Sequence, residues 1–166
     1  MQTKQALITA PFQTGVKQVD LAEPAANQIL VSTAYSAVSA GTELAVYTGK
    51  HQWLQDPKMV DWKFPFRPGY SAAGTVTAVG KDVSGWKPGD RVAYPGNHAS
   101  AELLTIGHER GRLWKIPDNL DFKTAAWSCV ARYGMGSSIR AGTSIGPCSP
   151  KRSRSNRDSP SVTKVQ

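Results

Sequence analysis

Histidine and cysteine are the side chains best suited to bind transition metals or take part in redox chemistry, and this sequence has few of them. The histidines are His51, His98 and His108, and no two have the spacing of a metal-binding pair. The cysteines, Cys129 and Cys148, form no Cys-x-x-Cys pair and no cluster with histidine. We therefore interpret each histidine as a solvated or hydrogen-bonded loop residue, and we expect neither a zinc knuckle nor a disulfide framework.

The composition is typical of a globular protein of about one domain. The chain has 166 residues, of which 40% are hydrophobic, and its 15 glycines and 11 prolines favour turns over long helices. The N-terminus has no apolar signal-peptide core, and no uncharged apolar stretch is long enough to cross a bilayer. We expect a mainly β protein in the cytoplasm, with no membrane partner.

The positive charge is concentrated near the end of the sequence. Residues 140–166 hold six Lys or Arg against one Asp, which accounts for +5 of the net charge of +8. From Pro147 onward the chain is polar and basic and has no aromatic residue. The prediction is a domain over residues 1–146 and a disordered basic tail over 147–166. A frameshift, an artificial chain end and a functional tail all remain open as origins of that segment.

Short β-branched runs between turn signals predict a series of strands. These runs cover residues 6–9, 28–35, 74–80, 91–94, 99–106 and 113–116. Gly74 and Gly80 are expected where a side chain would obstruct a close backbone approach, and Lys87-Pro-Gly-Asp90 is expected to form a tight turn. A β-rich body follows from this pattern.

Helical signals are short. Leu44 to Tyr47 predicts one helical turn that stops at Gly49, and Asp121 is a suitable N-cap for a helix at about 121–131. Residues 51–69 fit neither helical nor strand periodicity and predict a packed irregular loop. Its aromatic residues either anchor this loop or line a substrate cleft: Trp53, Trp62, Phe64 and Phe66.

Several motifs in order resemble the medium-chain dehydrogenase/reductase superfamily of alcohol dehydrogenase-like enzymes. They are Ser36-Ala-Val-Ser-Ala-Gly-Thr-Glu43, Pro68-Gly-Tyr-Ser-Ala-Ala-Gly74 through Gly80, and Gly85-Trp-Lys-Pro-Gly-Asp-Arg-Val92, followed by Ser100-Ala-Glu-Leu and Lys115-Ile-Pro-Asp118. The resemblance covers residues 1 to about 146. It implies a mainly β, GroES-like, partly open β-barrel with a few short helices, which in that superfamily precedes a Rossmann domain.

The nucleotide-binding signature of that second domain is not found in this sequence. A dinucleotide site needs a βαβ unit with a Gly-x-Gly-x-x-Gly turn, whereas Gly134-x-Gly136-x-x-Ile139 has no apolar strand before it and lacks the third glycine. The resemblance implies NAD or NADP as the cofactor of the full-length enzyme. We expect no cofactor-binding residue and no tight cofactor binding in this chain.

The resemblance also identifies the positions where zinc-dependent members hold their metal. Ser39 stands at the cysteine position, Tyr70 at the histidine position and Ser71 at the glutamate position, and Asp90 to Ala101 contains none of the cysteines of the structural zinc lobe. Because serine and tyrosine are poor zinc ligands at neutral pH, no zinc is expected at either site. The sequence is therefore similar to the zinc-independent members.

Four residues are the candidates for a site in the cleft: Thr42, Tyr70, Ser39 and Glu43. The resemblance places Thr42 at a proton-relay hydroxyl position and Tyr70 in the former zinc pocket. A structural alternative is that Thr42 caps a helical turn with Glu43 near its positive end, and that Tyr70 only fills space. Ala45 stands where many alcohol dehydrogenases place a relay histidine.

Two functions are considered. The first is the catalytic, substrate-side domain of a truncated zinc-independent NAD(P)-dependent oxidoreductase that acts on a small-molecule substrate and is inactive alone. The second is a non-catalytic GroES-like binding module whose basic tail engages nucleic acid or another acidic partner, with weak and salt-sensitive contacts. The oxidoreductase domain is the favoured function, and nucleic acid is a disfavoured partner. The sequence leaves open the oligomeric state, the substrate and the choice between NAD and NADP.

Overall fold

The computed structural model describes residues 1–107 and 112–134 of the chain. Within these residues seven strands form two sheets, accompanied by short helices, so the predicted mainly β class is confirmed. The elements are β1 (Gln2–Ala10), β2 (Gln13–Asp20), β3 (Gln28–Ser36), α1 (Thr42–Tyr47), the 3-10 turn η1 (Gln52–Leu54), β4 (Ala72–Val79), β5 (Arg91–Tyr94), β6 (Ala101–Thr105), β7 (Trp114–Lys115), α2 (Phe122–Ala125) and α3 (Ser128–Gly134).

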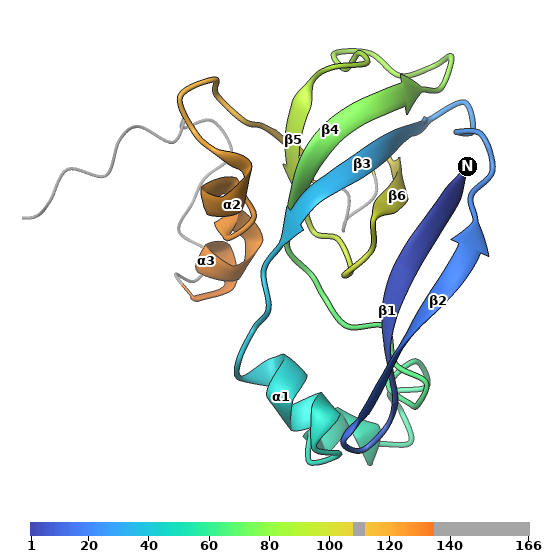
Figure 1. Cartoon of the computed structure of the whole chain (residues 1–166), viewed down its shortest axis with the longest axis vertical. Coiled ribbons are helices and arrows are strands. Elements are labelled where there is room, and N and C mark those ends of the chain that lie inside the picture. Colours follow the sequence, from blue (N-terminus) through green and yellow to red (C-terminus); the bar gives the residue numbers. More distant parts are fainter. Residues whose placement is uncertain (108–111, 135–166) are drawn as a thin grey trace, which may run out of the picture.

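The main sheet has five strands in the order β6-β3-β4-β5-β7, and every neighbouring pair is antiparallel. The hairpin β1-β2 lies beside this sheet, while α1 lies at one end of the hairpin and α2 and α3 lie on the opposite side of the molecule (Figure 1). Single bridges join β1 to the rest, one at Gln5 to Ala99 and one at Ile8 to Phe66. The strands therefore enclose a partly open barrel.

Two faces of the sheet carry side chains of different size, because neighbouring residues of a strand point to opposite faces. One face contributes the larger side chains of the core: Ile29, Val31, Val76, Val92 and Tyr94, together with Ala72. The other face presents Ala73 and Ala93, and α2 packs against it through Ala125 and Ala126. Since alanine is small, the helix can approach the sheet closely on that side.

The single helix predicted at about 121–131 is divided into α2 and α3, and this is a correction with a local cause. Asp121 is the N-cap as predicted, because its side chain accepts the backbone N–H of Thr124 at 2.8 Å. At the break, the fully buried Ser71 hydroxyl donates to the Ala126 carbonyl and accepts the Cys129 N–H at 3.2 Å. In an uninterrupted helix the Ala126 carbonyl would accept the Val130 N–H and the Cys129 N–H would donate to the Ala125 carbonyl. Ser71 therefore takes one backbone group from each of these two pairs.

The sequence predicted the strands of the five-stranded sheet more accurately than those of the β1-β2 hairpin. The strands expected over 28–35 and 91–94 become β3 and β5 with almost unchanged bounds, whereas β2 was not predicted at all. Gly74 and Gly80 lie so close to the backbones of Ser32 and Ala25 that a Cβ atom would collide with carbonyl oxygens. The expected reason for these two glycines is therefore confirmed.

Residues 51–69 form the predicted irregular loop, apart from η1. Its rings pack on each other: His51 stacks on Trp62 with 4.5 Å between ring centroids, and Trp62 contacts both Trp53 and Phe66. This packing supports the interpretation that the aromatic residues anchor the loop.

Several predictions fall outside the described residues. They concern His108, Cys148, the stretch from 135 to 146 with Gly136, and the basic segment 147–166. Within the described residues, no helix has both the length and the apolar character that a membrane crossing requires.

Candidate functional site

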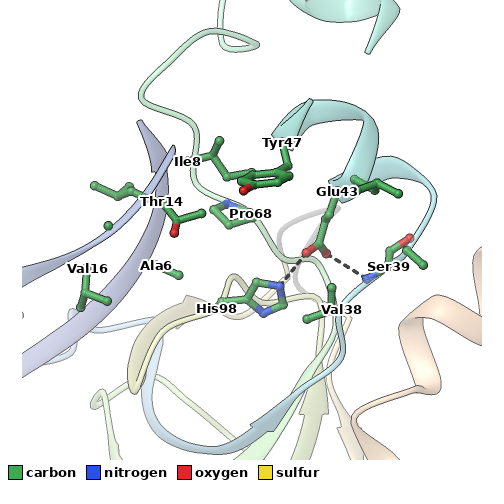
Figure 2. A pocket seen from close by; sticks show the side chains of 14 residues that line it. Ala6, Ile8, Thr14, Val16, Val38, Ser39, Glu43, Tyr47, Pro68 and His98 are labelled. Atoms are coloured by element: carbon green, nitrogen blue, oxygen red, sulfur yellow. Dashed lines mark hydrogen bonds and ion pairs between the residues drawn. The ribbon is translucent and has the colours of Figure 1, made fainter. Parts of the chain in front are cut away.

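A pocket of about 700 Å³ opens between the β1-β2 hairpin and α1 (Figure 2). Most of the side chains around it are aliphatic; of the polar ones, Ser39, Glu43 and His98 gather at the start of α1, Thr14 lies on β2 and Tyr47 lies at the end of α1. Its lining residues are Ala6, Leu7, Ile8, Thr14, Gly15, Val16, Val38, Ser39, Ala40, Glu43, Leu44, Tyr47, Pro68 and His98. An apolar cavity with a few convergent polar groups is the usual form of a small-molecule site.

Glu43 is the buried carboxylate of this pocket, with a side chain that is 9% exposed. It lies in the first turn of α1, whose N-cap, Gly41, has no side chain to satisfy the first backbone N–H groups. The Glu43 side chain bonds back to the segment before the cap: its Oε1 accepts the Ser39 N–H at 3.2 Å, while the Ser39 carbonyl accepts the Glu43 N–H at 3.1 Å. The local sequence therefore fixes the carboxylate at the start of the helix.

His98 reaches the same carboxylate from the turn before β6. Its Nε2 lies 2.8 Å from Glu43 Oε2, and its Nδ1 lies 2.8 Å from Ser36 Oγ at the end of β3. The backbone of His98 is held as well, since its N–H donates to the Pro68 carbonyl and its carbonyl accepts the Ala6 N–H. Ser36, His98 and Glu43 thus form one hydrogen-bonded chain that ends in the pocket.

Gly69 makes this arrangement possible. Its φ is +103°, in the region that favours glycine, and a Cβ atom there would collide with the backbone of Asn97 and His98. The segment around Pro68 and the turn that carries His98 can therefore lie against each other only if residue 69 has no side chain.

A second buried carboxylate, that of Glu102, supports the turn that carries His98. Glu102 accepts hydrogen bonds from the backbone N–H of Asn97 at 3.0 Å and from its side-chain amide at 2.9 Å. Burial raises the pKa of Glu102 above its usual value, and the two bonds from Asn97 and the nearby Arg67 oppose this shift. Burial also raises the pKa of Tyr94, whose hydroxyl lies 2.8 Å from that of Thr33. Glu102 holds the turn through Asn97, and neither Glu102 nor Tyr94 lines the pocket.

Comparison with known proteins connects this geometry to a family. Residues 25–135 match the family described as "Alcohol dehydrogenase GroES-like domain". The chain belongs to this family. The resemblance seen in the sequence motifs, and the GroES-like fold that it implied, are thereby confirmed.

Individual relatives of this GroES-like domain are oxidoreductases. The chain is 38% identical over 101 residues to 2-desacetyl-2-hydroxyethyl bacteriochlorophyllide A dehydrogenase of Cereibacter sphaeroides, a match that covers 61% of this chain and 30% of that enzyme. Among solved structures, the CurF ER cyclopropanase from the curacin A biosynthetic pathway has a TM-score of 0.66 at 23% identity and covers 80% of this chain. The Escherichia coli quinone oxidoreductase complexed with NADPH has a TM-score of 0.57 at 22% identity and covers 75% of it.

These matches extend over a minor part of each relative. The chain spans 30% of the Cereibacter sphaeroides enzyme, 41% of the CurF chain and 36% of the quinone oxidoreductase chain. The two solved structures show that the fold is shared.

The structure brings together two of the four site residues predicted from the sequence. Ser39 and Glu43 line the pocket, and Thr42 and Tyr70 are not among the lining residues. Thr42 is the first residue of α1 but not its cap, so the structural alternative proposed for it is wrong: the N-cap is Gly41. The expected place of Glu43 near the positive end of α1 is confirmed.

His98 is the residue whose place in the site the sequence did not indicate. It was interpreted as a solvated or hydrogen-bonded loop histidine, and it is indeed hydrogen-bonded, with a side chain that is 14% exposed. Its partners lie 55 and 62 positions away in the sequence, so no local pattern links them. Only the packing of the turn against Pro68 and β1 brings them together.

The donor set in the described residues does not fit a zinc ion. No group of three or more His, Cys, Asp or Glu side chains is gathered within residues 1–107 and 112–134. Glu43 and His98 come nearest, but they are two, and the atoms that would face a metal are bonded to each other. A catalytic zinc needs three protein ligands around an open position.

The described residues do not fit a dinucleotide either. Every paired strand in residues 1–107 and 112–134 is antiparallel, whereas the dinucleotide site is built on parallel strands joined by a helix whose N-terminus faces the pyrophosphate.

Proposed function

We propose that this chain forms the catalytic, substrate-side domain of a zinc-independent NAD(P)-dependent oxidoreductase of the medium-chain dehydrogenase/reductase type. The observation that carries the proposal is the position of the pocket. It borders Ser39 and Glu43, in the segment that bears the first zinc ligand in zinc-dependent members of the superfamily, and a carboxylate and an imidazole in its lining are hydrogen-bonded to each other.

The names of the relatives support the type of chemistry. A dehydrogenase of Cereibacter sphaeroides is the relative with 38% identity, and a structurally similar quinone oxidoreductase was solved with NADPH. We infer that the cofactor of the working enzyme is NAD or NADP and that residues outside this GroES-like domain bind it. The domain then contributes a place for the small-molecule substrate and polar groups that orient it. We further propose that the enzyme works in the cytoplasm.

The alternative of a nucleic-acid-binding or acidic-partner module depended on the basic segment 147–166. That segment lies outside the described residues, and no observation favours the alternative.

Cofactor titrations test the proposal on the chain as it is. NADH and NADPH should show no saturable binding in the micromolar range when followed by nicotinamide fluorescence. The chain alone should neither oxidise alcohols with NAD⁺ or NADP⁺ nor reduce enones or quinones with NADH or NADPH. Micromolar cofactor binding or turnover by the chain alone would contradict the proposal that residues outside this GroES-like domain bind the cofactor.

A chimera provides the complementary test. Residues 1–134 are joined to the NADPH-binding part of the Escherichia coli quinone oxidoreductase, and the product is assayed for reduction of enones and quinones with NADPH and for oxidation of alcohols with NADP⁺. We expect turnover of at least one of them that depends on NADPH or NADP⁺, without stoichiometric zinc by elemental analysis. A folded, NADPH-binding chimera that turns over none of them, or that requires added zinc, would refute the proposal.

A further inference from the structure

The strand β2 is the outer strand of the β1-β2 hairpin, and one of its two edges faces away from β1 (Figure 1). In a strand, the backbone N–H and carbonyl groups of successive residues point alternately to the two sides. On β1 the N–H groups of Ala6 and Ile8 donate to the carbonyls of His98 and Phe66, which lie on the side opposite to β2. The even-numbered residues of β1 are therefore turned away from β2, and the odd-numbered residues bond to it.

The register of the hairpin determines which backbone groups of β2 are open. The pairs that bond across it are Thr3 with Val19, Gln5 with Lys17 and Leu7 with Gly15. The Leu21 N–H donates to the Met1 carbonyl, which continues the same alternation. The even-numbered residues of β2, among them Thr14, Val16 and Gln18, consequently point their backbone groups outward. Within residues 1–107 and 112–134, no other segment donates to or accepts from these three backbones.

This edge of β2 has few of the features by which natural sheets protect their edges, which are short strands, prolines, bulges and charges. β2 has eight residues, contains no proline and pairs with β1 without a bulge from Asp20 to Thr14. Lys17 is its one charged residue between Gln13 and Val19. A long, regular and mostly uncharged edge of this kind can pair with a further strand.

A second copy of β2 satisfies the open groups in one antiparallel register. Outward-facing residues must pair with outward-facing residues, so even-numbered positions face even-numbered positions. With Val16 opposite Val16 of the second copy, Thr14 faces Gln18, and all three residues are paired. A shift by two positions in one direction places Lys17 opposite Lys17, where like charges repel. The opposite shift places Gln18 against Phe12, whose N–H already donates to the Tyr47 carbonyl.

Side chains also fit this register. Ala6 is the partner of Val16 within the hairpin, so the row across the two-fold axis reads Ala6, Val16, Val16 of the second copy and Ala6 of the second copy. Cross-strand pairs of β-branched residues stabilise a sheet, and Val16 is 73% exposed in the single chain. On the other face, Lys17 stands opposite Gly15 of the second copy, which has no side chain to obstruct it. Because Ala6 and Val16 line the pocket, the second copy extends the pocket wall by its own Val16.

We propose that β2 pairs antiparallel with β2 of a second copy of this chain about a two-fold axis at Val16, so that the two hairpins form one continuous sheet. Each copy donates three hydrogen bonds and accepts three, through Thr14, Val16 and Gln18. The interface uses the same edge on both copies, so it closes at the dimer. This pairing goes beyond the proposed function and does not depend on oxidoreductase chemistry.

Amide hydrogen exchange followed by NMR tests the pairing on the 166-residue chain. The protein concentration is raised to about 1 mM, since a small interface is weak, and about 150 mM salt screens the net charge of +8. Exchange of the Thr14, Val16 and Gln18 amides should slow by about fivefold or more. The amides of Gly15 and Lys17 bond to β1 and should not depend on concentration. Protection of the even-numbered amides at every concentration would show that the same chain covers the edge, and would overturn the proposal.

Sedimentation velocity over the same concentrations measures the size of the assembly. We expect monomer and dimer in equilibrium, with no larger species, because a two-fold interface leaves no free edge of β2. A chain that stays monomeric, or that grows into larger assemblies, contradicts the pairing of two β2 edges.

Two charge variants locate the register. Val16→Glu and Val16→Lys each place like charges opposite each other at the two-fold axis, so each variant alone should dimerise more weakly than the parent chain. An equimolar mixture places opposite charges there, and its dissociation constant should be about fivefold or more below that of either variant. Val60→Glu and Val60→Lys are the matched control, because Val60 is a similarly exposed valine outside β2, and their mixture should show no gain. A Val16 mixture that associates no more tightly than its components would overturn the proposal.

A proline variant tests the backbone hydrogen bonds. Val16→Pro removes an N–H that faces away from β1, so the ladder within the hairpin stays intact while pairing with a second copy is blocked. Val16→Thr keeps the N–H and the β-branched shape, and it should dimerise within about threefold of the parent chain. Dimerisation of Val16→Pro at the strength of the parent chain would overturn the proposal. The charge variants keep every backbone N–H, so the two tests are independent of each other.

Discussion

Glu43 Oε2 and His98 Nε2 lie 2.8 Å apart although 55 positions separate the two residues in the chain. One comes from the first turn of α1 and the other from the turn before β6, and the Ser39 N–H and the Ser36 hydroxyl complete the set of partners. Both side chains line the pocket, so a substitution at either residue should affect the stability of this region as well as the polar groups that the pocket offers to a ligand.

Removing the carboxylate should destabilise the domain. In Glu43→Ala the Ser39 N–H and the His98 ring both lose an acceptor in a largely buried place, so we expect the free energy of unfolding to fall by about 2 kcal/mol. Urea denaturation measures this change. Glu23→Ala, at an exposed position, is the control and should remain within about 0.5 kcal/mol of the parent chain. Equal changes in the free energy of unfolding for the two substitutions would show that the Glu43–His98 pair makes no specific contribution to stability.

Gly69 and Gly85 provide a matched comparison between close approach and backbone strain. Both have positive φ, of +103° and +78°, but an added Cβ collides with the backbone of Asn97 and His98 only at Gly69 and meets nothing within 4 Å at Gly85. Gly85→Ala should cost about 1 kcal/mol from backbone conformation alone. Gly69→Ala should cost about 2 kcal/mol or more and should shift the NMR signals of His98. If both variants lose the same stability and leave His98 unchanged, Gly69 does not position the turn.

Ser71 should matter for the two short helices rather than for the pocket. It is fully buried and bonds the Ala126 carbonyl and the Cys129 N–H, so Ser71→Ala leaves both backbone groups without this partner. We expect a loss of about 1–3 kcal/mol in unfolding free energy and faster amide exchange in α3. The exposed Ser84→Ala serves as the control. Unchanged exchange in α3 would argue against the role of Ser71 at the helix break.

Glu102 should make stability depend on pH with a definite sign. Burial raises its pKa in the folded protein above the ordinary value of 4.5, so the stability that Glu102 contributes is fully present below that value and is lost as the pH rises through the folded pKa. Glu102→Gln cannot ionise, so its unfolding free energy relative to the parent chain should increase from pH 4 to pH 8. Urea denaturation at a series of pH values measures that difference, and a difference that is constant with pH would contradict the prediction.

Asp90 and Asp121 act in the opposite direction, which is why the comparison with Glu102→Gln is needed. The pKa of Asp90 is lowered, mainly by its hydrogen bond from Lys115, and the pKa of Asp121 is lowered by the Thr124 N–H that it accepts as N-cap. The stability that these two groups contribute is present above their ordinary value of 3.8 and is lost as the pH falls through the folded pKa. Both are unchanged in Glu102→Gln, so their effect cancels in the difference.

The sequence alone determined the strands of the main sheet, the turn at Lys87 to Asp90 and the N-cap at Asp121. Each of these depends on neighbouring residues: β-branched runs, a Pro-Gly pair, and a side chain three positions from the N–H that it accepts. It also determined the local part of the site, because Glu43 is fixed by Ser39 four positions earlier. The sequence motifs also carry the resemblance to the GroES-like family, to which residues 25–135 belong.

Tertiary structure decided the rest. The hairpin strand β2 has a weak alternation of its own and is specified by pairing with β1, and the helix after Asp121 breaks because Ser71, more than 50 positions earlier, takes backbone hydrogen bonds from it. His98 joins Glu43 and Ser36 for the same kind of reason: Gly69 lets two backbone segments come together, and the hydrogen bonds to Pro68 and Ala6 hold the turn there. Such long-range contacts leave no periodic signal in the sequence, because their partners are chosen by packing rather than by spacing along the chain.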